Sequence, residues 1–420
     1  MASAAFSGKQ VEMKRTQENK NGIIAALFLF QYSLLIPLMR VFSPTILVAV
    51  SGILLMLATF FINKRVAVTL KSFAIIAGLL SIILIKTFID DTELMVGINF
   101  LMIAIPSVVV FSYRFDVDSF LSACKKLAII NFFLLFWIPF VSKLTAYMRF
   151  GYGMVLTVMF TYLSVFRSAK DETTRKAGKK GVITKALNIA IFIVSLVETV
   201  IYGNRGVLVV ILAFIALDVL FIYKKNHFRN VALILAGFVA LMNLEGILGI
   251  LIRMAQRFGI NSYALRKYQY QLMYGLEEAS SGRGRLYLSA IDTIKEHPIL
   301  GAKMVTYDDG TLYVHNLFLQ VGRDMGVVMM IVSAVFVIYC LWIILSKKTQ
   351  VSEKTVLAVF FCVSVVRLMI SSNLWERPEF WALVGIALNY KEILFTSDSS
   401  SQDSAPYGVN VLEKRRKMKV

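Results

Sequence analysis

The stretch SGRGRLYLSAIDTIKEHPILGAKMVTYDDGTLYVHNLFLQVGRDMG (residues 281–326) is the longest polar interval of the chain away from its two ends. On both sides of it the sequence consists of apolar runs close to the length of about 20 residues that a helix needs to cross a bilayer. The 420 residues are 58% apolar and 17% charged, whereas soluble domains are typically about 45–50% apolar and about 25% charged. These observations predict an all-α polytopic integral membrane protein in which this stretch belongs to one long polar loop.

The apolar runs predict twelve transmembrane helices. They cover residues 22–39, 43–62, 72–89, 94–111, 127–142, 150–166, 183–201, 206–222, 231–251, 326–345, 355–371 and 379–394. Lysines and arginines concentrate in alternate connections between these runs, as cytoplasmic loops do under the positive-inside rule. This alternation predicts that both termini are cytoplasmic and that the long loop lies outside the membrane.

The predicted organisation has five parts. They are a cytoplasmic N-terminal tail (1–21), the first nine transmembrane helices (22–251), a long extracytoplasmic loop (252–325), the last three transmembrane helices (326–394) and a disordered basic cytoplasmic tail (395–420). Within the loop, residues 261–279 predict an interfacial helix on the membrane surface, and residues 285–297 predict a short helix stopped by Pro298. The net charge of +19 lies mainly between the apolar runs, where it orients the spans and meets anionic lipid. Nucleic acid is therefore not a predicted partner.

Basic side chains recur at the span ends that face the long loop. Arg205 lies in YGNRG between two predicted spans, and Arg283 lies in SGRGR, where glycines allow unusual backbone conformations. Each has a structural alternative, because Arg205 could be an interfacial anchor and Arg283 could belong to a solvated turn. Further candidates for binding a substrate are Tyr202, Arg285, Asn316, Arg323 and Arg377.

His315 opens an apolar run at the predicted water boundary and is one of three histidines. A lone histidine is often structural, but an imidazole can also take up a proton near neutral pH. Guanidinium groups grip phosphate oxygens bidentately and stay charged, so they could stabilise a diphosphate leaving group. These side chains together favour transfer of a group from a lipid diphosphate to a hydroxyl. The sequence predicts no metal site, disulfide or cofactor, because its acids form no convincing ligand set and its cysteines lie in or beside spans.

Two segments resemble a known family. SGRGRLYLSAIDTIKEHPILG (281–301) and HNLFLQVGRDMG (315–326) resemble the signature region of the O-antigen ligase and O-antigen polymerase superfamily. GNRG (203–206) resembles the family's turn of a small residue, an arginine and a glycine between two spans. Twelve spans with one long outer loop between late spans also match, while Tyr287 stands where the family usually has a tryptophan.

The resemblance implies glycan transfer from undecaprenyl diphosphate on the outer face of the bacterial cytoplasmic membrane, without a sugar nucleotide or a metal. It implies that Arg205 and Arg283 hold the diphosphate and that His315 activates the acceptor. The leading expectation is a polymerase of capsule, exopolysaccharide or O-antigen, with undecaprenyl diphosphate-linked oligosaccharides as donor and acceptor. The other expected partners are membrane lipids, a chain-length regulator and flippase proteins. A ligase that moves finished glycan to another acceptor, a transporter of the lipid-linked unit and a structural scaffold stay open as alternatives.

Overall fold

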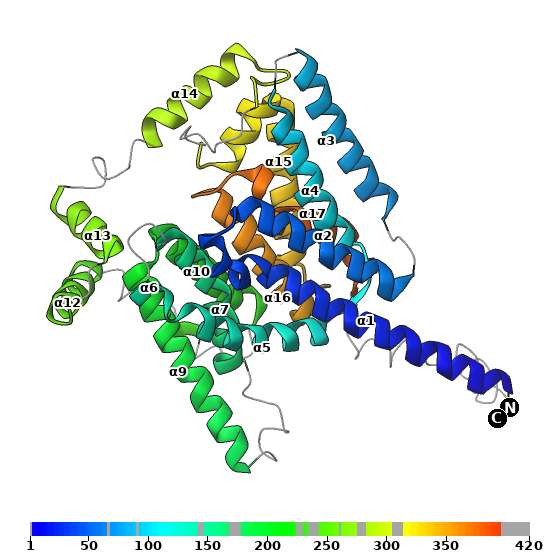
Figure 1. Cartoon of the computed structure of the whole chain (residues 1–420), viewed down its shortest axis with the longest axis horizontal. Helices are drawn as coiled ribbons and strands as arrows, with labels where there is room; N and C mark the ends of the chain where they lie inside the picture. Colours follow the sequence, from blue (N-terminus) through cyan, green and yellow to red (C-terminus); the bar gives the residue numbers. More distant parts are fainter. Residues whose placement is uncertain are drawn as a thin grey trace, which may run out of the picture.

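The computed structural model (Figure 1) describes residues 2–64, 68–89, 92–141, 147–167, 178–223, 230–232, 235, 243–259, 262–274, 283–304 and 314–395. Its α-helices are α1 (Ala2–Leu35), α2 (Pro44–Asn63), α3 (Leu70–Ile89), α4 (Leu94–Val110), α5 (Val117–Leu135), α6 (Ile138–Val141), α7 (Tyr147–Phe166), α9 (Gly178–Tyr202), α10 (Arg205–Leu217), α12 (Leu244–Arg257), α13 (Tyr263–Tyr274), α14 (Arg283–Glu296), α15 (Leu317–Leu345), α16 (Val351–Phe361) and α17 (Pro378–Ile393). Short 3-10 or π segments are η1 (Leu38–Arg40), η3 (Asp218–Ile222), η5 (Cys362–Val366) and η6 (Leu374–Glu376). Two short strands, β1 (Phe115–Asp116) and β2 (Leu394–Phe395), pair in parallel.

Seven helices within the described ranges are long and apolar enough to cross a membrane. They are Pro44–Asn63, Leu70–Ile89, Val117–Val141, Arg149–Phe166, Gly181–Tyr202, Arg205–Ile222 and Leu317–Leu345. The structure therefore agrees with the predicted all-α membrane protein, but the predicted count of twelve spans is not confirmed.

Irregular backbone and short helices account for part of the difference in the number of spans. The apolar run 355–371 is not one regular helix, because α16 ends at Phe361 and a π segment follows. α4 is apolar but has only 17 residues. Nine of the 21 residues of the predicted ninth span, 231–251, and nearly all of the predicted C-terminal tail lie outside the described residues.

Three helices begin well before their predicted starts. α5 begins at Val117 instead of 127, because the Asp116 side chain caps it by accepting a hydrogen bond of 2.7 Å from the Ser119 N–H. α1 begins at Ala2, so residues 2–21, predicted as a tail, form the first part of the helix that continues into the first apolar run. α15 begins at Leu317 instead of 326, because the Asn316 side chain accepts hydrogen bonds from the backbone N–H groups of Phe318 (3.0 Å) and Leu319 (3.1 Å). The predicted start coincides with a kink at Gly326, where φ is 84°. The end of the predicted loop is therefore the first part of a long helix.

Burial distinguishes central from peripheral helices. In α7, 83% of the residues of the apolar window are buried, whereas in α3 the share is 17%. Figure 1 shows α3 along one side of the molecule and α12 and α13 on the opposite side. Gly151 of α7 lies against Gly203, since a Cβ on Gly151 would come within 2.9 Å of the Gly203 Cα. This close approach packs the turn between α9 and α10 onto the central helix.

Candidate active site

A cavity of about 450 Å³ lies where α10, α14 and α15 begin. Residues of α7, α13 and the segment after α16 complete its wall. Its polar and charged lining residues are Tyr152, Asn204, Arg205, Lys267, Tyr268, Arg283, His315 and Ser371. The described lining contains no aspartate or glutamate. Cationic side chains and the positive ends of helix dipoles thus meet around one space, an arrangement that favours a polyanion.

Arg205 is the first residue of α10. The preceding residue, Asn204, caps this helix, because its side chain accepts a hydrogen bond of 3.1 Å from the N–H of Val207. Gly203 donates its N–H to the Thr199 carbonyl at 2.9 Å and ends α9. The GNRG sequence therefore forms a tight turn that places one guanidinium and one helix N-terminus at the cavity.

His315 lies directly before the cap of α15 and is one of three non-glycine residues with positive φ in the described chain, at 56°. Histidine is among the residues enriched in this conformation, and such backbone strain often occurs at functional sites. Tyr287 donates a hydrogen bond of 3.4 Å from its Oη to the His315 carbonyl. Tyr287 of α14 thus contacts the histidine backbone.

Burial, and secondarily the positive charge of Arg283, lowers the pKa of His315 from 6.5 to about 4. The imidazole is therefore neutral near pH 7 and can accept a proton. Because Arg283 perturbs the histidine electrostatically, the two predicted catalytic side chains share one environment. Arg283 begins α14 and is half-buried.

Lys267 and Tyr268 are lining residues that the sequence did not predict. The pKa of Lys267 is lowered by burial and by the charges of Arg205 and Arg283, and burial raises the pKa of Tyr268 to about 12. Tyr268 is buried and packs in a cluster with Leu265, so this face of α13 lies against the protein. α13, the described part of the helix predicted over 261–279, thus contributes to the cavity wall, and the periodicity of its tyrosines was the available sequence signal.

Two predicted substrate-binding residues support α15 in the structure. Asn316 is the helix cap described above. Arg323 pairs with its neighbour Asp324 at 2.6 Å, and the Arg323 carbonyl accepts a hydrogen bond of 2.7 Å from the N–H of Ala302. Neither residue lines the cavity.

The other three predicted substrate-binding residues also lie outside the cavity lining. The Tyr202 ring packs against Phe140 and Phe150. Arg285 is exposed on α14. Arg377 lies 5.6 Å from the ring centre of Tyr32. Of the eight predicted site residues, Arg205, Arg283 and His315 are the ones that the fold brings together around one space.

The described residues include no group of three or more histidine, cysteine, aspartate or glutamate side chains that could hold a metal ion. Compared with models of protein families and with curated proteins, the chain matches none.

Proposed function

We propose that the protein is a membrane glycan polymerase that transfers a growing oligosaccharide from undecaprenyl diphosphate to the next lipid-linked repeat unit. The observation that supports this proposal is one cavity lined by Arg205, Lys267, Arg283 and a neutral His315. Three basic side chains suit a diphosphate, and the histidine suits an acceptor hydroxyl. The products would be capsule, exopolysaccharide or O-antigen.

In the proposed reaction, the bond between the sugar anomeric carbon and the diphosphate oxygen breaks, and its electron pair leaves with the diphosphate. A new bond forms between the anomeric carbon and the acceptor oxygen, whose proton passes to His315. Arg205, Lys267 and Arg283 stabilise the charge that develops on the leaving diphosphate. No electrons enter or leave the system, so the step needs no oxidant or reductant.

Burial and the positive charge of Arg283 make His315 a weak base. A bound diphosphate would place negative charge beside His315 and offset the positive charge of Arg283. Negative charge favours the protonated imidazole, so the donor would raise the proton affinity of the base that the transfer requires. In this proposal, the donor itself prepares the site for the acceptor.

The cavity is proposed to face the periplasm or the cell exterior from the bacterial cytoplasmic membrane, with both termini cytoplasmic. A ligase would use the same residues and differ only in its acceptor. A transporter of lipid-linked units would use the basic residues to hold its cargo. Flippase and chain-length regulator proteins are proposed partners of the polymerase.

The test is transfer by the purified protein in liposomes supplied with a lipid diphosphate-linked repeat unit from its own host. We expect a ladder of glycans that disappears in Arg283→Ala and His315→Ala and persists in Arg266→Ala. Arg266 is a matched basic control because it lies beside Lys267 on α13 but is exposed and outside the lining.

Two other outcomes contradict the polymerase, and a third contradicts the proposed site. Transfer only to a foreign acceptor would identify a ligase. Movement of lipid-linked units across the bilayer without transfer would identify a transporter. A ladder that is unchanged in both alanine variants would show that this cavity is not the site of transfer.

A further inference from the structure

An apolar groove of about 310 Å³ runs between α3, α15 and α17. α3 and α15 are two of the helices that are long and apolar enough to cross a membrane. The described lining of the groove contains no charged side chain and one hydroxyl, that of Ser333. Gly78 of α3 and Val332 of α15 line the groove and are exposed, so the groove opens on the surface that a bilayer would cover. Its volume falls within the range of about 300–1,000 Å³ that ligand pockets have, and its chemistry suits a hydrocarbon chain.

The groove also has the length that such a chain requires. Its wall on α15 extends from Val321 to Phe336, which is about 22 Å at 1.5 Å per residue. The hydrocarbon core of a bilayer is about 30 Å thick, so an extended chain could lie along the groove for much of that depth. Lipid tails are as apolar as the lining, and binding would therefore come from close packing.

The groove is a neighbour of the large cavity, although their described linings share no residue. Ser371 lines the cavity, and Leu374 and Trp375 of the same segment line the groove. Three residues span at most about 11 Å, so the two linings approach each other within that distance. The start of α15 is divided in the same way, with His315 at the cavity and Val321 in the groove.

Buried side chains of α15 hold the segment that lies between the two spaces. The Gln320 side chain donates from Nε2 to the Asn373 Oδ1 at 2.7 Å and accepts from the N–H of Leu374 at 3.3 Å. The indole N–H of Trp375 donates to the Asp324 Oδ2 at 3.2 Å. Gln320 and Asp324 are each 1% exposed. The Trp375 ring is therefore a fixed part of the groove wall.

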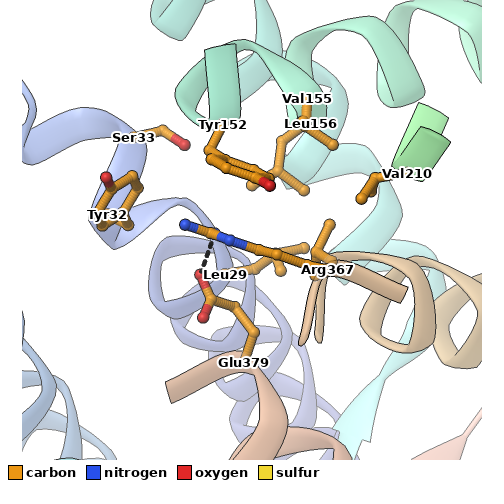
Figure 2. A pocket seen from close by; sticks show the side chains of 10 residues that line it. Leu29, Tyr32, Ser33, Tyr152, Val155, Leu156, Val210, Arg367 and Glu379 are labelled. Atoms are coloured by element: carbon orange, nitrogen blue, oxygen red, sulfur yellow. Dashed lines mark ion pairs between the residues drawn. The ribbon is translucent and has the colours of Figure 1, made fainter. Parts of the chain in front are cut away.

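A buried ion pair ties the same segment to α17. Arg367 follows the π segment η5, and its Nη1 pairs with Glu379 of α17 at 3.8 Å (Figure 2). Its Nε donates to the hydroxyl of Ser372 at 3.2 Å. Ser372 has a φ of 99°, a strained value that persists only where the surroundings fix the backbone. Glu379 directly precedes Phe380 and Trp381 of the groove wall. The segment thus forms a rigid divider between groove and cavity.

We propose that the groove holds the polyprenyl chain of the acceptor, the lipid-linked repeat unit that receives the glycan. This inference rests on the proposed function, in which donor and acceptor each carry such a chain. The donor brings its diphosphate into the large cavity, because the bond at that diphosphate breaks. The acceptor brings the hydroxyl of its terminal sugar to His315, and its lipid lies one repeat unit away from that hydroxyl. A second lipid site beside the cavity, behind a rigid divider, meets this requirement.

Gly78 allows the groove to be filled without a clash. A Cβ at this position would meet no atom of the described residues within 4 Å, so Gly78→Phe would place its ring in the groove. The matched control is Gly246→Phe on α12. A Cβ at Gly246 likewise meets no described atom within 4 Å, and this residue lies outside the groove lining. Glycine is a poor helix former, so neither variant should lower the melting temperature.

The test is a single round of transfer by the full chain in liposomes. The donor is a repeat unit on polyprenyl diphosphate that lacks the acceptor hydroxyl. The acceptor is a repeat unit joined to polyprenol without a diphosphate, so that it cannot donate. We expect Gly78→Phe to raise KM for this acceptor about threefold or more, because the ring removes packing contacts that are individually weak but numerous. KM for the donor, and KM for an acceptor with a short prenyl chain, should not change. Gly246→Phe should behave like the unaltered protein with both acceptors.

The other outcomes overturn different statements. If the unaltered protein forms no glycan ladder from complete lipid-linked units, the proposed function fails and the inference fails with it. If the ladder forms and Gly78→Phe leaves KM for the polyprenyl acceptor unchanged, the proposed function stands and the groove is left to ordinary membrane lipid. A rise in KM for the donor alone would assign the groove to the donor chain. An equal rise for the long-chain and short-chain acceptors would show that the ring disturbs the divider and displaces no bound chain.

Discussion

The charge state of His315 offers a quantitative test of the cavity. With a pKa of about 4, about 3% of this imidazole is protonated at pH 5.5, whereas an imidazole with the ordinary pKa of 6.5 is about 90% protonated. Burial is the larger cause and the charge of Arg283 the second. Replacing Arg283 by glutamine should therefore raise the pKa of His315 without restoring 6.5. Inorganic pyrophosphate should raise it in the unaltered protein, because negative charge favours the imidazolium.

The measurement is nuclear magnetic resonance of histidine-labelled protein in detergent across pH 3.5 to 8. His315→Gln assigns the signal, and His297, which is exposed at the end of α14, serves as the reference. A pKa of His315 near 6.5 without added pyrophosphate would refute the assignment of His315 to a buried site. A pKa that does not respond to Arg283→Gln would show that the two side chains do not share an environment.

Three further predictions concern the cavity arginines, the kink of α15 and Lys86. Arg205→Ala and Arg283→Ala should abolish glycan transfer at normal expression, and lysine at either position should restore little of it because bidentate geometry is lost. Gly326→Ala should destabilise the protein by at least about 1–3 kcal/mol in thermal unfolding, since φ is 84° and the new Cβ would lie 2.1 Å from the Ile299 carbonyl oxygen. Lys86→Met should lower the melting temperature, because it removes hydrogen bonds of 3.0 and 3.2 Å to two backbone carbonyls of the segment between α14 and α15. Full activity in both arginine variants, or unchanged melting of the other two, would contradict these expectations.

Periodicity and end signals in the sequence located most helices, because apolar runs and caps are local properties. The predicted start of α15 was wrong because the cap at Asn316 begins the helix ten residues before the kink at Gly326. The predicted number of twelve spans is not confirmed, and irregular backbone is again one reason. Hydropathy does not detect the π segment that interrupts the run after Phe361.

The cavity residues that the sequence predicted are the ones that lie at or near the start of a helix. Arg205, Arg283 and His315 each lie at or beside a first helical residue, so a turn motif could identify them. Lys267 lies along an amphipathic helix, where the pattern does not say which neighbour the polar face meets. Tyr152 lies within an apolar run, where a tyrosine is ordinarily a packing residue. Their roles depend on contacts between distant segments.

The long loop positions catalytic candidates because much of its described part is attached to helices. The Ala302 N–H donates to the Arg323 carbonyl at 2.7 Å, and the N–H of Val327 donates to the Pro298 carbonyl at 2.8 Å. Lys86 of α3, with 1% of its surface exposed, donates to the carbonyls of Leu300 and Gly301. The connection between α14 and α15 is thus fastened to the kink of one spanning helix and to the end of another. Sites on rigid elements hold their geometry better than sites on free loops. The kink therefore helps the described part of this connection to hold Arg283 and His315 at the cavity that Arg205, the first residue of α10, also lines.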